Sequence, residues 1–200
     1  MRKFFRSAKP DPQTALKELM TAIEQEDSEQ VEKLLKAQAE LLDLRNEFGV
    51  FPLLYATSRQ SIKMVEILLA AGAAVNQSNR DDSHPLAIAV LEGNVGLAER
   101  LLEAGAHPDR PDRYQATLLF YCAQHDQAKM ATLLLRYGAN PSQRESEGDT
   151  PLIYAAMVNA LQTAEVLLKN GADKHAKNFD GLSALDKAHH PAMQQLLTQS

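Results

Sequence analysis

The chain has little of what several large protein classes need. Its 200 residues contain one cysteine, so an internal disulfide framework is excluded, and a reducing cytosol is compatible with that count. The formal net charge of -5 argues against a general polyanion binder, because such a protein needs a concentrated Lys/Arg surface. No P-loop or dinucleotide-binding glycine pattern is present. With 44% hydrophobic and 24% charged residues, the composition is that of an ordinary globular chain.

Long apolar runs are also missing. The basic start, Met1 to Ser7, lacks the apolar core of about 7 to 15 residues that a secretory signal needs, because Arg6 and Lys9 interrupt it. No segment approaches the roughly 18 apolar residues typical of a membrane span. We therefore expect a cytoplasmic protein that does not bind membranes. Residues 1–10 are interpreted as a basic tail covering the first helix, with membrane-surface or partner docking as the alternative.

What the chain does have is a repeat. The segment Leu68-Leu69-Ala70-Ala71-Gly72-Ala73 returns three times, with the glycines 33 residues apart at Gly72, Gly105, Gly138 and Gly171. Glycine enters the left-handed conformation that ends a helix without steric cost, so each one predicts a helix end. A fixed period of this size is typical of a stacked repeat protein.

A second landmark keeps the same phase. Pro52, Pro85, Leu118, Pro151 and Ala184 each precede a leucine and are again 33 apart. Proline suits the first turn of a helix, and the preceding Thr117, Thr150 and Ser183 are candidate caps. Each repeat therefore predicts a turn, a short helix, a tight turn, a longer helix, a glycine stop and an extended loop. The tight turns carry Gln60, Gly93, Asp126 and Asn159.

Over residues 46–190 these units resemble ankyrin repeats, whose pattern is Gly-x-Thr-Pro-Leu-His-x-Ala followed by Val-x-x-Leu-Leu and Gly-Ala. The best copy runs from Gly148-Asp149-Thr150-Pro151-Leu152 to Gly171-Ala172. The resemblance implies an all-α ankyrin-repeat solenoid of about six stacked helix-turn-helix units with extended hairpin loops and atypical caps. The family's histidine is replaced in every copy, by Leu54, Ala87, Phe120, Ile153 and Asp186, so we expect stability to depend more on apolar stacking. The repeat that carries Gln115 and Leu118, in place of the turn glycine and the proline, should be the least ideal.

The predicted organisation has four parts. After the tail at 1–10, residues 11–45 form an N-terminal capping helix pair, with helices starting after Asp11 and Asp27. Residues 46–177 form four regular repeats, at 46–78, 79–111, 112–144 and 145–177. Residues 178–200 form a C-terminal capping repeat whose second helix is shortened to 192–197.

Candidate chemistry is sparse. Cys122 and His125 have the spacing of a pair on one helix surface, but a shift of 33 residues from Cys122 gives Ala89 or Ala155, so Cys122 is predicted to fill a buried small-residue position. His189 and His190 are adjacent residues, which on a helix point in different directions. We therefore predict a non-catalytic protein without cofactor or metal, and keep a small metal-binding or thiol-dependent enzyme as the alternative.

In the family, a partner protein docks in the groove formed by the loop tips and first helices. Carried over by register, the resemblance implies partner contacts at Glu47, Phe48, Arg59, Arg80, Asp81, Glu92, Arg113, Tyr114, Gln124, His125, Glu147, Met157, Phe179 and Asp180. Tyr and Arg often anchor interfaces, although each loop aromatic has covering the adjacent loop as an equal alternative. Charges of both signs alternate along the loops, which favours a specific protein surface over a phosphate backbone. Binding of nucleic acid through Arg80, Arg113 and Arg144 is the third hypothesis.

The sequence thus predicts a protein-protein interaction module, monomeric when free, that works as a stand-alone inhibitor or a small adapter. The identity of the partner lies outside what the residues indicate.

Overall fold

The computed structural model describes residues 11–199, so the predicted tail at 1–10 lies outside the described residues. The described residues form helices and loops, with an isolated bridge between Lys177 and Ser183 in place of strands. The chain divides into two compact units, Met1–Pro85 and Leu86–Ser200.

The first unit contains two helix pairs. Helices α1 (Pro12–Glu24) and α2 (Ser28–Ala37) pack together, and the 3-10 helix η1 (Ala39–Leu42), which the sequence did not predict, follows them. The carboxylates of Asp11 and Asp27 accept hydrogen bonds from the third residue on and cap these helices, as predicted. Helices α3 (Pro52–Ser58) and α4 (Ile62–Ala70) form the second pair, and α1 packs on α3.

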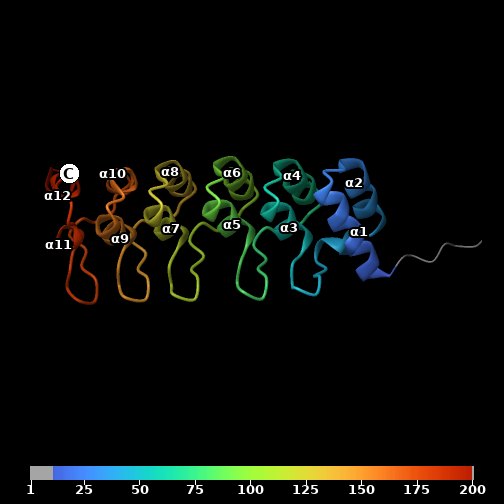
Figure 1. Ribbon diagram of the computed structural model, residues 1–200, viewed down its shortest axis with the longest axis horizontal. Helices are drawn as coiled ribbons and strands as arrows, with labels where there is room; N and C mark the ends of the chain where they lie inside the picture. The colour runs from blue at the N-terminus through green and yellow to red at the C-terminus, as the bar shows by residue number, and fades with distance from the viewer. Residues whose placement is uncertain (1–10, 200) are drawn as a thin grey trace, which may run out of the picture. The chain divides into compact units, whose positions relative to one another are not determined.

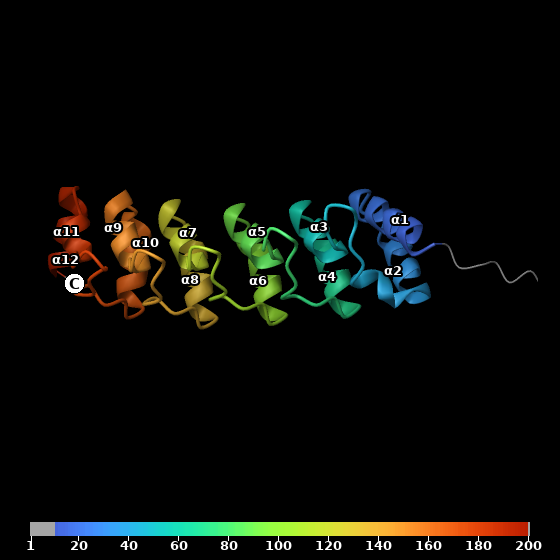
Figure 2. The ribbon, with the colours of Figure 1, turned by 90° about the horizontal axis from the view of Figure 1, so that it is seen from below.

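The second unit repeats the same hairpin. Its short helices are α5 (Pro85–Leu91), whose first residue closes the preceding unit, α7 (Leu118–Gln124), α9 (Pro151–Val158) and α11 (Ala184–Lys187). Its longer helices are α6 (Val95–Glu103), α8 (Ala128–Arg136), α10 (Leu161–Lys169) and α12 (Pro191–Gln199). Within this unit, α7, α9 and α11 pack as one row and α6, α8 and α10 as another. Figure 1 shows the extended loops on the side of the short helices, and Figure 2 shows the two rows from below.

The glycines predicted to end the longer helices have a left-handed backbone conformation. Gly72, Gly105, Gly138 and Gly171 have φ between 85° and 96°. The tight turns repeat this at Gln60, Gly93, Asp126 and Asn159, with φ between 47° and 67°. A glutamine at φ 58° is unusual, and the backbone bond from Ser61 N to Ala56 O at 3.2 Å holds that turn.

One predicted cap is wrong. Thr150 accepts from Ile153 N, and Ser183 forms a reciprocal capping box with Asp186. Thr117, however, makes no side-chain cap, and in the described part of the chain its buried Oγ1 has no hydrogen-bond partner. Phe120 N bonds instead to the backbone carbonyl of Thr117 at 3.0 Å, which tightens the first turn of α7.

The last repeat also differs from the prediction. Helix α12 has nine residues, as α8 and α10 have, whereas α11 has only four. The shortening therefore falls on the first helix of the pair. Pro191 disfavours a helical conformation at His190, and Ala188 is already extended, so α11 ends early.

One small residue in each repeat is buried in the core at the same register position. Ala56, Ala89, Cys122, Ala155 and Ala188 are all at most 3% exposed. This confirms that Cys122 occupies the buried small-residue position of its repeat.

Candidate partner-binding groove

The extended loops are held by a side chain that recurs every 33 residues. Its oxygen accepts the backbone N–H groups two and four residues on, for example 2.7 Å and 3.0 Å from Asp112 Oδ1 to Tyr114 N and Ala116 N. The five members are Asn46, Asn79, Asp112, Glu145 and Asn178. Sequence reasoning missed this series, although its period and its acceptor side chains were visible. These bonds give each loop its own bracing in place of the missing family histidine.

Neighbouring loops of the second unit are also bonded to one another. Ser146 N donates to Tyr114 O at 2.9 Å, and Phe179 N donates to Glu147 O at 3.3 Å. The guanidinium of Arg144 donates to the carbonyls of Gly148 and Lys177, at 2.7 Å and 2.6 Å. Three consecutive loops therefore form one hydrogen-bonded edge.

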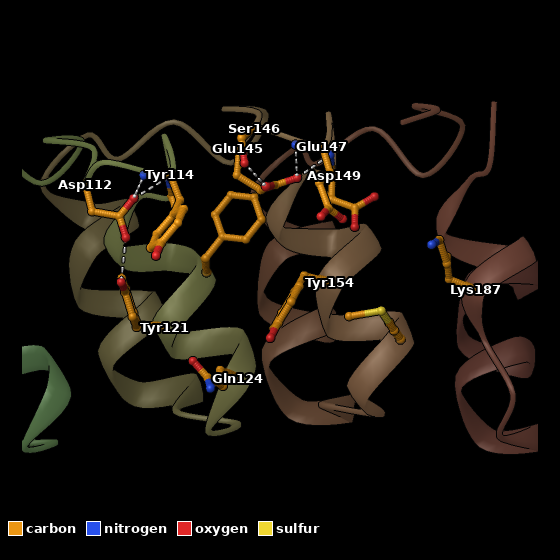
Figure 3. Close-up of a pocket in the computed structure, with 13 residues that line it drawn as sticks. Asp112, Tyr114, Tyr121, Gln124, Glu145, Ser146, Glu147, Asp149, Tyr154 and Lys187 are labelled. Carbon is orange, nitrogen blue, oxygen red and sulfur yellow. Dashed lines mark hydrogen bonds between the residues drawn. The ribbon is translucent and has the colours of Figure 1, made fainter. Parts of the chain in front are cut away.

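An open groove of about 340 Å³ lies between this edge and the short helices (Figure 3). Loop residues Asp112, Tyr114, Ala116, Glu145, Ser146, Glu147 and Asp149 line it, together with Phe120, Tyr121 and Gln124 of α7, Tyr154 and Met157 of α9, and Lys187 of α11. All of them belong to the second unit.

The floor of the groove is aromatic. The rings of Phe120 and Tyr154 meet edge to face, with centroids 5.9 Å apart. Phe120 stands where the family has its histidine, so the substitution replaces a polar brace with an apolar contact between repeats. Above this floor, Tyr114 is 58% exposed and Met157 39% exposed, so both present apolar surface to solvent.

The wall beside α7 is fixed by a carboxylate. Tyr121 donates its hydroxyl to Asp112 Oδ2 at 2.7 Å, while Oδ1 holds the loop amides. Burial, and then the hydrogen bond to Asp112, raises the pKa of Tyr121 to about 12. Tyr121 is therefore a neutral donor at physiological pH, and the Asp112 charge has no cationic partner in these bonds.

The other wall concentrates negative charge. Carboxylate oxygens of Glu145, Glu147 and Asp149 lie within 4.8 Å of one another. Glu145 Oε1 accepts the amides of Glu147 and Asp149, and the buried Asp149 accepts 2.8 Å from Asn178 Nδ2. Glu147 is exposed at the rim. Lys187 is the single cationic side chain among the lining residues.

The first unit has a polar hollow in the corresponding place. Its volume is about 390 Å³, and Lys17, Glu24, Glu47 and Tyr55 are among its lining residues. Arg59 pairs with Glu24 at 3.6 Å across an exposed surface. Burial, and then the charge of Glu24, raises the pKa of Tyr55. This hollow has one aromatic ring, whereas the groove of the second unit has four.

The structure brings together only part of the predicted contact set. Tyr114, Gln124, Glu147 and Met157 line the groove, and Glu47 lines the polar hollow. His125, predicted as a helix-face contact together with Gln124, is exposed and does not line the groove. The missed positions Tyr121 and Tyr154 lie three residues before Gln124 and Met157, a helical spacing that indicates the same face.

Several other predicted contacts have structural roles or lie elsewhere. The Phe179 ring lies on Gly148, where an added Cβ would be 2.7 Å from Phe179 Cδ1, so this aromatic covers the adjacent loop. Arg80 lies in the same way on Gly49. Arg113 stacks on the Tyr114 ring, with Cζ 5.2 Å from the centroid. Phe48, Asp81, Glu92 and Asp180 are exposed and do not line the groove.

The structure gives little support to the thiol-enzyme, metal-binding and nucleic-acid-binding hypotheses. Cys122 is fully buried, and burial raises the pKa of its thiol to about 12, whereas His125 is exposed. Within residues 11–199, the group of possible metal ligands that lie close together is the carboxylate set Glu145, Glu147 and Asp149, without a histidine. Arg144, one of the three arginines of the nucleic-acid hypothesis, is occupied by two carbonyls.

Helix hairpins repeated every 33 residues, with loops bonded edge to edge, define a helical repeat protein. A family model of ankyrin repeats matches residues 19–112 and 108–178, so the chain belongs to the ankyrin repeat family. No curated protein matches the chain. Among the described residues, none of the helices has the length and apolarity needed to cross a membrane.

Proposed function

We propose that this protein is a non-catalytic module that binds a partner protein in the groove between the loops of the second unit and α7, α9 and α11. The observation that carries the proposal is the combination of exposed Tyr114 and Met157 with a hydrogen-bonded frame beneath them. Membership of a family that generally mediates protein-protein interaction supports it.

The frame matters energetically. Binding by flexible loops loses conformational entropy when the loops become ordered, whereas loops already held by internal hydrogen bonds lose less. Asp112, Glu145 and Asn178 each hold their own loop, and Arg144 joins two loops together. Affinity can then come from burying Tyr114 and Met157 without a large ordering cost.

We further propose that the protein acts on its partner as a stand-alone inhibitor or as a small adapter. A cytoplasmic location and a monomeric free state stay predictions, as do the contacts at Phe48, Arg80 and Asp81 in the first unit. The complete burial of Cys122 argues against a thiol-dependent enzyme.

Affinity capture from a lysate of the source organism tests the proposal. The bait is the full chain as wild type, as Tyr114→Ala combined with Met157→Ala, and as Val158→Ala. Val158 is a matched control, because it is 40% exposed beside Met157 but does not line the groove. Helicity and thermal midpoint are compared first for all three forms.

A partner that is retained by the wild type and by Val158→Ala, and lost by the double variant, supports the groove. Its activity is then measured with increasing amounts of this protein: inhibition indicates an inhibitor, and unchanged activity an adapter. Equal retention by all three forms would show that the binding surface lies elsewhere.

A further inference from the structure

The lining of the groove is mostly acidic as well as apolar. Asp112, Glu145, Glu147 and Asp149 contribute four carboxylates, against the single ammonium of Lys187. The hydrogen bonds that Asp112 and Asp149 accept come from neutral donors, namely backbone amides, the Tyr121 hydroxyl and the Asn178 amide. These bonds orient the carboxylates without cancelling their charge.

The aromatic lining favours the same sign of ligand. Ring faces attract cations, and Tyr114 already has the guanidinium of Arg113 stacked on it. Figure 3 shows Tyr114 and Glu147 at the loop side of the groove, Tyr154 on the helix below Glu147, and Lys187 apart from them on the next helix. An arginine or lysine side chain entering this space would pack its aliphatic stem on the apolar residues and bring its charge to the acidic rim.

We propose, building on the proposed function, that the partner presents a basic segment whose arginine or lysine side chain occupies the groove, with Glu147 as its exposed counter-charge. Charge complementarity of this kind both steers association and rejects acidic segments. Lys187 in the lining and Arg113 stacked on Tyr114 would repel further positive charge, which favours one cationic side chain over a continuous polybasic tract.

A random short-peptide library displayed on phage is the probe. Peptides are selected on the full wild-type chain and then depleted on the variant with Tyr114→Ala and Met157→Ala, so that the survivors depend on the groove. Enrichment of arginine or lysine at one position of the survivors is the expected result.

The strongest peptide is then synthesised in two forms, one with its basic residue and one with a neutral isostere, citrulline for arginine or norleucine for lysine. We expect the neutral form to bind the wild type about tenfold more weakly or worse. On Glu147→Gln that difference should shrink, whereas on Glu29→Gln it should persist. Glu29 is a matched control, because it is an exposed glutamate of α2 in the first unit and lines neither the groove nor the polar hollow.

The outcomes separate the two proposals. Groove-dependent peptides without a preferred basic residue, or an equal effect of the isostere on wild type and Glu147→Gln, would overturn this inference and leave the proposed function standing. A failure to select any groove-dependent peptide would count against both. Binding only to a chain that lacks residues 1–10 would identify the protein's own basic tail as the occupant and overturn a partner segment.

Discussion

Two consecutive repeats of the second unit, 112–144 and 145–177, form the same helix hairpin and braced loop from different turn residues. The later repeat has glycine at the left-handed loop position and proline at the first helical residue, and Thr150 caps α9. The earlier repeat has Gln115 at φ 62°, leucine at 118 and an uncapped Thr117. It nevertheless forms a similar loop, because Asp112 holds the loop amides as Glu145 does in the later repeat, and Asp112 also accepts the hydroxyl of Tyr121.

The comparison shows that the degenerate repeat keeps the side-chain brace that the later repeat also has, although it lacks the turn glycine and the proline. It also shows where the groove comes from, because the degenerate repeat supplies Tyr114, Phe120 and Tyr121.

The largest effect should follow from Gly148→Ala. The residue has φ +82°, and an added Cβ would lie 2.7 Å from Phe179 Cδ1 and 2.9 Å from Phe179 N. Strain and overpacking together should cost about 3 kcal/mol in the free energy of unfolding, measured in urea. Gly171→Ala is the control, with φ +85° and no described atom within 4 Å of the added Cβ, and should cost about 1 kcal/mol. Equal losses for the two variants would show that Phe179 does not press on Gly148.

The second effect tests the hydrogen bonds that the Asp112 carboxylate accepts. Asp112→Ala leaves two loop amides and the Tyr121 hydroxyl without their acceptor and should cost about 2 kcal/mol. Asp112→Asn should cost about 0.5 kcal/mol or less, because asparagine holds the loops at 46, 79 and 178. The measurement is again urea unfolding of the full chain. If the alanine variant is as stable as the asparagine variant, the side-chain brace is not what maintains this loop.

A smaller contrast distinguishes the two threonines. Thr150→Val removes the cap of α9 and should cost about 1 kcal/mol. Thr117→Val removes a buried hydroxyl that has no partner in the described structure, and should be neutral or stabilising by about 0.5 kcal/mol. Thermal unfolding of both variants checks this. A clear loss at Thr117 would mean that its hydroxyl is hydrogen-bonded in solution.

The smallest effect is a loss of stability that appears only at alkaline pH. The pKa of Tyr121 is raised from 10.0 to about 12, so the folded state favours the neutral phenol. This contribution to stability is complete below pH 10.0 and is lost as pH rises toward about 12. The free energy of unfolding, measured across that window by urea titration, should therefore fall less steeply in Tyr121→Phe than in the wild type. Cys122, with its pKa raised to about 12, titrates in the same range, so both forms should carry Cys122→Ala. Identical slopes for the two forms would remove Tyr121 as the alkaline-sensitive group.

The sequence by itself determined the repeat. The 33-residue period, the helix starts at proline, the stops at glycine and the buried position of Cys122 are local or periodic signals, each set by a few residues and their backbone preferences. They predicted the family and nearly every helix. In the last repeat the sequence predicted a shortened second helix, whereas the first helix, α11, is the short one. Pro191 disfavours a helical conformation at the residue before it, and the repeat pattern does not include this effect.

Only the tertiary structure decided which side chains meet. Phe120 and Tyr154 meet edge to face because residues about 33 apart lie side by side when repeats stack. Tyr114 lines the same groove from the loop. The same packing placed Phe179 against Gly148 while leaving 75% of Phe179 exposed, and it left Met157 39% exposed. Which neighbour a loop aromatic contacts depends on the adjacent repeat, and the pattern within one repeat does not specify that neighbour.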